Sequence, residues 1–409
     1  MDKKEHKLKP VETDWDEIRK KVREHKKQQL KKILVVLGCI LAVLVVLYVA
    51  SQVKTYSKYK TLDSIERADT SATNFMTFQH NVLKYSNDGV VYADDDNNII
   101  WNQTFEMDRP LMAKSENYVA FADLDGQQIY VMDENGLAGS VKTNMSIKKI
   151  AVSAQGTIAV LMESQHTSYL ALYNMKGEVL AEGAIHMENS GYPMDIALSA
   201  DGKKLAVSIL DFASGTVKTT LSFYNFGTVG QNQIDNIVNT YSYAGTVMPK
   251  LVYVDESTML AFADTGVMIF EGSQVPELTG EVLVSAEIKS IFYDDRFFGL
   301  IVQDPETENG RKLVIYDMHG SEITDASLDM AYTQAYFLDN HEVCIQNEGQ
   351  CQIYTLFGVK KFESSFASEV YHVRNRIGVR NYSIFIEGST EHIRCKFFSS
   401  TRFAKETEE

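Results

Sequence analysis

Cysteine and tryptophan are scarce in this chain, which has 4 cysteines and 2 tryptophans among 409 residues. Three of the cysteines, Cys344, Cys351 and Cys395, lie in the C-terminal part, and so sparse and odd a set argues against a disulfide-based scaffold. Cys344 and Cys351 flank the sequence IQNEGQ, which is typical of a hairpin turn. A cross-strand disulfide between them is therefore one alternative, and two unpaired thiols, which we favour, are the other.

Catalytic and metal-binding motifs are lacking as well. The sequence has no G-x-S-x-G nucleophile motif and no P-loop, and its nine histidines have no paired spacing for zinc. Residues 94–98 (DDDNN) and 123–126 (DLDG) faintly resemble calcium loops but lack the bidentate acid that such a loop needs further on. We interpret both as hairpin turns. The sequence thus predicts no catalytic residue, no cofactor and no metal, and a protein that is not an enzyme.

Positive charge is concentrated at the N-terminus. Residues 1–32 hold 12 Lys and Arg against 7 Asp and Glu, whereas the rest of the chain holds 28 against 48. A domain with such an excess of negative charge repels the phosphate backbone, so we expect no nucleic-acid partner.

The one long hydrophobic run is ILVVLGCILAVLVVLYVA, residues 33–50, which has no charged residue. Crossing a bilayer takes about 20 apolar residues, with about 17 as the minimum. Cleavage as a signal peptide is disfavoured because 32 residues precede the run and Tyr48 stands where a small residue belongs. Lipidation at Cys39 is disfavoured because the run continues beyond it. We therefore predict a transmembrane helix that anchors the chain in the lipid bilayer.

The orientation of the anchor follows from its flanks. Eight basic residues lie between residues 19 and 32, and only four lie over a comparable length after residue 50. The positive-inside rule then places residues 1–32, a basic segment predicted to be helical from residue 12, in the cytoplasm. We expect a single-pass protein of the cell membrane with residues 51–72 as a polar stalk and the C-terminal domain outside the membrane.

From residue 73 onward, short runs rich in Val, Ile, Tyr and Phe alternate with turns that end in glycine. One strand-plus-turn pattern recurs as YVMDENG, ALYNMKG, SFYNFG, MIFEG, VIYDMHG and IYTLFG, with its glycines 38 to 50 residues apart. Each interval has room for four short strands. This period predicts an all-β domain, a β-propeller over residues 73–399 followed by a polar tail at 400–409. Eight blades are favoured and seven are the alternative, and closure requires the first and last units to meet.

Two stretches carry a resemblance to known repeats. DIALSADGKKLAVS, residues 195–208, looks like the strand–turn–strand of WD40-like and TolB-like blades, and VVYADDDNNIIWNQTF, residues 91–106, resembles quinoprotein-type (PQQ-like) blades. Anchor, stalk and propeller in this order are similar to an uncharacterised family of single-pass, membrane-anchored propeller proteins from clostridia-like Gram-positive bacteria. The resemblance implies fold and topology only, because that family is a domain of unknown function.

The longest connection, residues 225–249, is the predicted interaction surface, since recognition residues tend to lie on loops held by a rigid scaffold. Its candidate residues are Asn225, Gln231, Asn232, Gln233, Asp235, Tyr241 and Tyr243. A second polar hairpin, residues 302–312, is a weaker candidate. For both, a solvated loop without a partner is the alternative.

We expect a non-catalytic scaffold or assembly factor that docks other membrane or cell-envelope proteins. A ligand-binding envelope sensor that signals through the transmembrane helix is the alternative. A quinoprotein-like enzyme is disfavoured, because such enzymes use many tryptophan docking motifs and a pair of adjacent cysteines, and this chain has two tryptophans and no adjacent cysteines.

Overall fold

The computed structural model describes residues 15–69, 72–165, 167–212, 215–304, 306 and 310–396. The first part of the predicted cytoplasmic segment, residues 1–14, and the predicted tail, residues 400–409, lie outside this range. The chain divides between Lys54 and Thr55 into two compact units. We describe each unit by itself.

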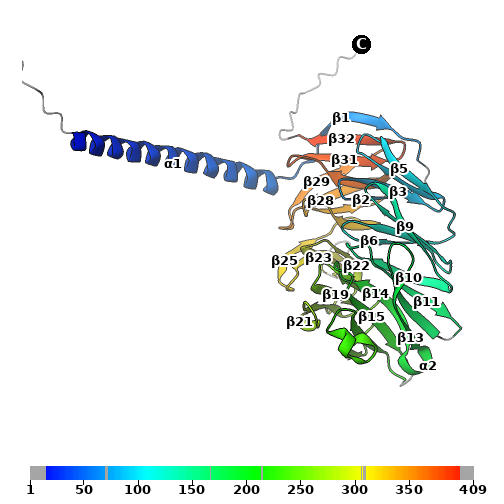
Figure 1. The fold of residues 1–409 in the computed structure, drawn as a ribbon. Helices are drawn as coiled ribbons and strands as arrows, with labels where there is room; N and C mark the ends of the chain where they lie inside the picture. The colour runs from blue at the N-terminus through cyan, green and yellow to red at the C-terminus, as the bar shows by residue number, and fades with distance from the viewer. Residues whose placement is uncertain are drawn as a thin grey trace, which may run out of the picture. The chain divides into compact units, whose positions relative to one another are not determined.

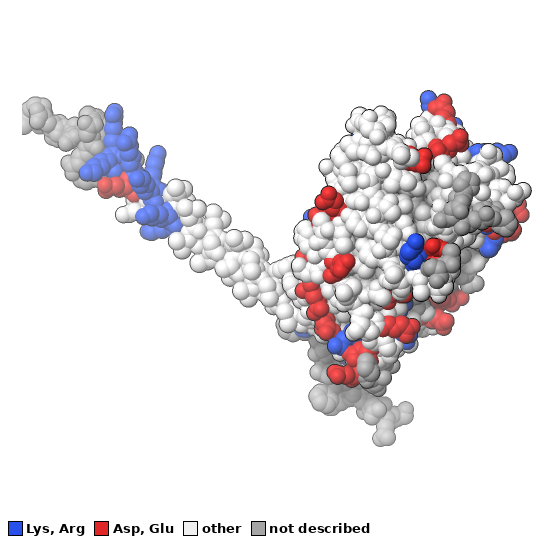
Figure 2. All heavy atoms as spheres, turned by 90° about the horizontal axis from the view of Figure 1, so that it is seen from below, with Lys and Arg blue, Asp and Glu red and all other residues white. Residues whose placement is uncertain are grey.

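The first unit contains one continuous helix, α1 (Trp15–Val53). Lys and Arg gather on its first half and the stretch that follows has no charged side chain (Figure 2). The segment Arg23–Ala50 is long and apolar enough to cross a membrane. Its apolar side chains are exposed, with Val35 and Val46 each 65% accessible. This helix is therefore of the kind that serves as a signal sequence or a membrane anchor.

The second unit consists of eight four-stranded antiparallel sheets (Figure 1), which confirms the prediction of an eight-bladed propeller and excludes seven blades. In at least five of the eight seams the first strands of neighbouring sheets contact one another, so the sheets surround a central axis. The first four blades are blade 1, β2 (Asn74–Phe78), β3 (Asn81–Ser86), β4 (Gly89–Ala93), β5 (Ile99–Thr104); blade 2, β6 (Pro110–Lys114), β7 (Val119–Asp123), β8 (Gln128–Asp133), β9 (Gly136–Lys142); blade 3, β10 (Ser146–Val152), β11 (Ile158–Ser164), β12 (Thr167–Tyr173), β13 (Val179–His186); and blade 4, β14 (Tyr192–Leu198), β15 (Lys204–Asp211), β16 (Lys218–Asn225), β17 (Ile237–Ala244).

The remaining blades are blade 5, β18 (Lys250–Tyr253), β19 (Thr258–Ala263), β20 (Gly266–Glu271), β21 (Glu277–Leu283); blade 6, β22 (Ile288–Tyr293), β23 (Phe297–Gln303), β24 (Arg311–Asp317), β25 (Glu322–Ser327); blade 7, β26 (Gln334–Phe337), β27 (Val343–Gln346), β28 (Gln350–Tyr354), β29 (Lys360–Ser365); and blade 8, β30 (Val370–Asn375), β31 (Asn381–Ile386), β32 (Ser389–Cys395), β1 (Tyr59–Glu66). Three short helices complete the described elements, α2 (Met187–Ser190), η1 (Gly230–Asn232) and η2 (Ile234–Asn236). The recurring glycines of the sequence pattern fall at the turn between the third and fourth strands of blades 2 to 7.

The fourth strand of blade 8 comes from the beginning of the domain. Strand β1 pairs antiparallel with β32, with Tyr59 opposite Cys395 and Glu66 opposite Ser389 (Figure 1). Just before it, Tyr56 bonds to blade 7, its N–H donating to the carbonyl of Lys361 at 2.7 Å. The predicted stalk at 51–72 is therefore wrong for residues 55–67. These residues belong to the propeller because their backbone groups complete its last sheet and close the ring.

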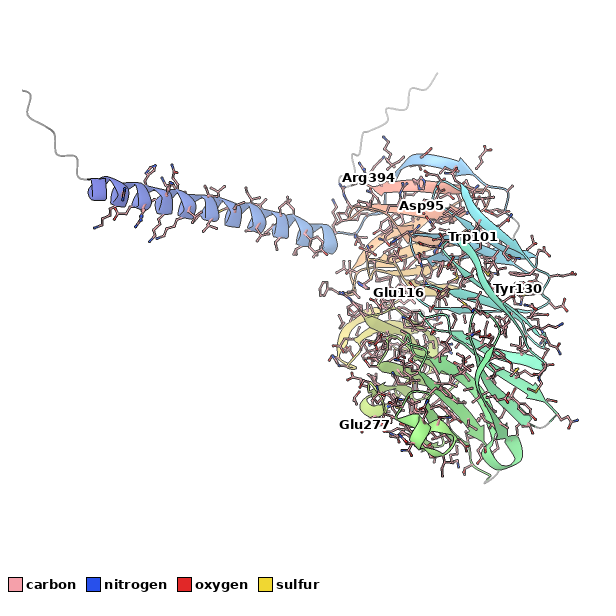
Figure 3. All side chains as sticks on the ribbon, viewed as in Figure 1. Asp95, Trp101, Glu116, Tyr130, Glu277 and Arg394 are labelled. Atoms are coloured by element: carbon pink, nitrogen blue, oxygen red, sulfur yellow. The ribbon has the colours of Figure 1, made fainter. Side chains whose placement is uncertain are left out.

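Apolar clusters hold consecutive blades together. In the described chain, seven such clusters are found, and each spans one seam between consecutive blades, from the seam of blades 1 and 2 to that of blades 7 and 8. Trp101 contributes to the first seam, where its indole N–H donates to the carbonyl of Glu134 at 3.1 Å, and Tyr130 stacks there on Phe105 (Figure 3). Burial of apolar area thus stabilises each of these seams.

The seam that closes the ring, between blades 8 and 1, contains buried charged groups beside the stacked rings of Phe75 and Tyr371. The Arg67 guanidinium is buried, donates to the carbonyl of Ile386 in blade 8 at 2.6 Å and pairs with Asp69 at 3.2 Å. Asp69 in turn pairs with Lys84 of blade 1 at 3.2 Å. Arg67 also lies over the rings of Phe75 and Phe385, one from each blade.

The turn at residues 94–98, which faintly resembled a calcium loop, belongs to the same seam. Asp95 pairs with Arg374 of blade 8 at 2.6 Å, and Asp96 lies 3.2 Å from Nε2 of His392. Nearby, burial lowers the pKa of His372 to about 3, and the positive charges of Arg374 and Lys114 act in the same direction. Its neutral imidazole lies 3.0 Å from the Thr77 hydroxyl in blade 1. The carboxylates of Asp95 and Asp96 therefore bind side chains of blade 8, and that of Asp94 accepts hydrogen bonds from within the turn.

Candidate functional site

A groove of about 540 Å³ lies between blades 3 and 4. One wall is formed by β12 and β13, the outer strands of blade 3, and the other by β15 and β16 of blade 4. The turn at residues 226–236 lies at one end, since it follows β16, and Ser190 of α2 lies at the other. We call this feature the blade 3–4 groove.

Small side chains on the outermost strand keep this groove open. On β13, Ala181 is paired with Leu172 and Gly183 with Leu170, and these two leucines belong to the apolar cluster between blades 3 and 4. Because side chains alternate along a strand, Ala181, Gly183 and Ile185 all face blade 4. A Cβ atom added at Gly183 would meet no atom within 4 Å.

Glycines on two other outermost strands are covered by the next blade. A Cβ atom at Gly139 of β9 would lie 2.5 Å from the carbonyl oxygen of Met175, and one at Gly280 of β21 would lie 3.4 Å from that of His319. Met175 and His319 belong to the short turns between the third and fourth strands of blades 3 and 6. In blade 4 this turn is replaced by the longer segment 226–236. The residue of β13 that corresponds in register to Gly139 and Gly280 is Ala181, and the uncovered Gly183 lies two residues further along the strand.

The base of segment 226–236 is fixed by Asn225. Its side chain is buried, donates to the carbonyl of Gln274 in blade 5 at 2.7 Å and accepts the N–H of Gly227 at 2.7 Å. The backbone then passes so close to itself at Gly230 that a Cβ atom there would lie 1.5 Å from the carbonyl oxygen of Asn225. Only glycine fits such an approach, so the segment has a defined shape.

The groove carries more negative than positive charge. Asp211 pairs with Lys218 at 3.6 Å at one end, and Asp235 of η2 lies at the opposite end, where it is exposed. Between them, Tyr224 has its pKa raised to about 12, first by burial and then by the charge of Asp235. The phenol therefore stays neutral at physiological pH. Thr220 and Ser222 of β16 add hydroxyl groups to the wall.

The predicted loop residues divide into two groups. Gln231, Asn232, Gln233 and Asp235 are exposed on segment 226–236, and Asp235 lines the groove. The other three, Asn225, Tyr241 and Tyr243, have structural contacts, the tyrosines on β17 against blade 5. The ring of Tyr241 lies 5.1 Å from that of Phe270, and its hydroxyl accepts the N–H of Leu278 at 3.3 Å. Burial raises the pKa of Tyr243 to about 12.

The wall opposite the loop had no signal in the sequence, because an alanine and a glycine on an outer strand are ordinary residues. The second predicted loop, residues 302–312, includes positions 305 and 307–309, which lie outside the described residues. Of the groove, only residues of the loop that follows β16 were therefore predicted from the sequence.

Cys344 and Cys351 are free thiols on the adjacent strands β27 and β28. Their sulfur atoms lie 3.7 Å apart, inside the apolar cluster between blades 7 and 8. The pKa of Cys351 is raised well above its ordinary value by the hydrogen bond with Cys344 and by burial. The thiol form is therefore favoured over the thiolate, and the thiolate is the reactive form.

In the part of the chain that the structure describes, one set of side chains could hold a metal ion. Asp294 and Asp295, in the first turn of blade 6, and His341, in the first turn of blade 7, each offer a ligand atom, and these atoms lie within 4.8 Å of one another. His341 Nδ1 is 2.7 Å from an Asp294 carboxylate oxygen, a contact that already links the two blades. This set could not be recognised in the sequence, because 45 residues lie between Asp295 and His341.

Comparison with solved structures finds several proteins of similar fold. The C-terminal WD40 domain of Sif2 is 10% identical and superposes with a TM-score of 0.54 over 84% of this chain and 100% of that one. Sqt1 from Saccharomyces cerevisiae is 13% identical, with a TM-score of 0.50, and the match covers 83% of this chain and 98% of Sqt1. BamB from Moraxella catarrhalis is 12% identical, with a TM-score of 0.46, and the match covers 82% of this chain and 100% of BamB.

At these identities, the likeness to Sif2 and Sqt1 concerns the propeller fold alone. None of the curated proteins matches this chain detectably in sequence. A family model does match, over residues 52–395, and its description is a family of unknown function, DUF5711. Because the match covers most of the chain, including every strand of the propeller, the protein belongs to the DUF5711 family.

Proposed function

We propose that this protein is a non-catalytic scaffold of the cell envelope, anchored in the membrane by α1, with its propeller outside the membrane as a docking platform for other membrane or envelope proteins. The observation that carries the proposal is the blade 3–4 groove, an open surface on a closed ring whose blades are fixed to one another. Because the blades are fixed, the binding surface keeps one shape, and less conformational entropy is lost when a partner binds.

The distribution of charge supports the membrane topology. The basic residues before residue 33 suit the cytoplasmic side of a bilayer, and the propeller carries a large negative excess. Within the described residues, one helix is long and apolar enough to span a membrane. The scaffold would thus present the groove outside the membrane that holds its anchor.

A capture experiment tests this function. The full-length protein is crosslinked in its native membrane and purified beside a chain that ends at residue 58 and so retains the anchor without the propeller. We expect a reproducible set of envelope proteins with the full-length chain that is missing from the anchor alone. Recovery of the protein itself and nothing else would overturn the scaffold.

A sensor is the second candidate function, and one observation favours it. Only Lys54 separates the end of α1 at Val53 from Thr55, whose hydroxyl donates to the carbonyl of Lys360 in blade 7 at 2.7 Å. A connection that is this short in sequence is what a transmitted signal would need. The same capture with residues 1–25 deleted separates the two functions, because a scaffold keeps its partners and its cellular role, whereas a sensor keeps the partners and loses the role.

A further inference from the structure

We propose that the blade 3–4 groove binds an extended segment of a partner polypeptide, rich in apolar residues and carrying a basic residue, as an additional strand along β13. This inference rests on the scaffold function and specifies the chemistry of its partner.

The backbone of β13 is available for pairing. Among the strands that the structure describes, β13 is bonded to β12 and to no other, so one edge of its N–H and C=O groups has no strand partner there. Five consecutive residues, 181 to 185, line the groove, which shows that this edge borders it. An extended peptide can satisfy such an edge by main-chain hydrogen bonds, and its alternate side chains then enter the adjoining pocket.

The space beside β13 fits one more strand. A neighbouring strand lies about 4.8 Å away, and a glycine on the receiving strand permits close approach of another backbone. Gly183 stands in the middle of β13 with no atom within 4 Å of its missing Cβ. The eight residues of β13 correspond to about 26 Å at about 3.3 Å per residue, which is long enough for a peptide of six to eight residues.

The groove walls determine which side chains the peptide needs. Leu170, Leu172 and Ile209 offer an apolar floor, so an alternate apolar residue of the peptide would gain burial there. At the loop end of the groove, Asp235 supplies a negative charge that a Lys or Arg would complement.

The groove can be filled without disturbing the fold. In the variant Gly183→Trp, the new side chain extends into the open groove from a strand position whose backbone has ordinary negative φ. The matched control is Ala138→Trp, an exposed small residue on β9, the outermost strand of blade 2. We expect both variants to melt within about 2 °C of the parent protein, which establishes that any loss of binding is local.

The binding experiment uses the full-length protein in detergent micelles and a random dodecapeptide library displayed on phage, with counter-selection on Gly183→Trp. Enriched sequences should alternate apolar residues with other residues and contain Lys or Arg. As synthetic peptides they should bind at least tenfold more weakly to Gly183→Trp and unchanged to Ala138→Trp. Enrichment that is insensitive to Gly183→Trp, or a failure to enrich any peptide, would overturn the proposal.

Two further measurements test the mode of binding. Methylation of alternate peptide nitrogens removes donors without changing charge, so it should abolish binding if the peptide pairs with β13 and leave it unchanged if only side chains are recognised. Asp235→Asn, which tolerates the left-handed backbone at this position (φ 55°), should weaken binding severalfold. If the peptide experiments show no binding in the groove but the capture experiment recovers envelope proteins, the scaffold function holds and its partner binds at another surface.

Discussion

Replacing Arg67 by Ala should destabilise the propeller by about 3–5 kcal/mol, the range measured when one partner of a buried ion pair is removed. The guanidinium of Arg67 is fully buried and contacts Asp69, the carbonyl of Ile386 and two aromatic rings at the seam between blades 8 and 1. Its loss leaves Asp69 with one cation instead of two and leaves a cavity where the ring closes.

Urea unfolding of the full-length protein in micelles measures this effect, with the fluorescence of Trp101 as the signal. The control is Arg394→Ala on β32 of the same blade (Figure 3), because Arg394 is exposed and its guanidinium makes a single side-chain contact, with Asn381 at 3.0 Å. We expect Arg394→Ala to cost less than about 1 kcal/mol. If the two substitutions lower the free energy of unfolding equally, Arg67 has no special role in closing the ring of blades.

The second large effect is expected at the seam between blades 7 and 8. Lys361 of β29 forms a buried ion pair with Glu342, whose second oxygen accepts the hydroxyl of Tyr382 at 2.7 Å. Lys361→Met would leave a buried carboxylate and Glu342→Gln a buried ammonium, so each should cost about 3–5 kcal/mol. The double variant buries no net charge and Gln still accepts from Tyr382, so it should cost markedly less than the sum.

The same urea titration measures the three variants. Lys360→Met is the control, since the neighbouring Lys360 pairs with Asp329 and Glu363, both at 3.1 Å, at the surface. An exposed pair contributes at most about 1 kcal/mol. Additive effects of Lys361→Met and Glu342→Gln would contradict the coupling that we infer from the structure.

The blades could be predicted from the sequence because each repeats the same local signals. Buried strands such as Thr258–Ala263 are runs of apolar residues, and the turns after the third strands need a residue such as Gly177, which has φ 78°. Strand propensity and turn chemistry thus agree at every repeat. The number of such repeats along the domain then gives the number of blades.

The closing strand could not be predicted in the same way. Strand β1 reads YKTLDSIE and most of its side chains are exposed, because an outermost strand needs only its backbone to complete a sheet. Its composition is that of a polar linker, and its partner β32 lies more than 300 residues away. Arg67 lies in the segment predicted to be a polar stalk, and its burial could not be predicted because it depends on groups from two distant blades.

The blade 3–4 groove shows a further limit of prediction from sequence. Segment 226–236 stands out in the sequence as an insertion, but the opening beside it depends on Ala181 and Gly183, where side chains are missing. An absent side chain leaves no motif. Tyr241 and Tyr243 were assigned to a loop because they follow the insertion, whereas in the structure they are on β17 and pack against blade 5.

The most direct measurement of the central claim is photocrosslinking from the groove in the native membrane. A photoreactive amino acid is placed at position 183 of the full-length protein, and the same residue at position 138 is the control. We predict an adduct with a distinct partner protein from position 183 that is missing from position 138. The same adducts from both positions, or none from position 183, would contradict a scaffold that docks its partner between blades 3 and 4.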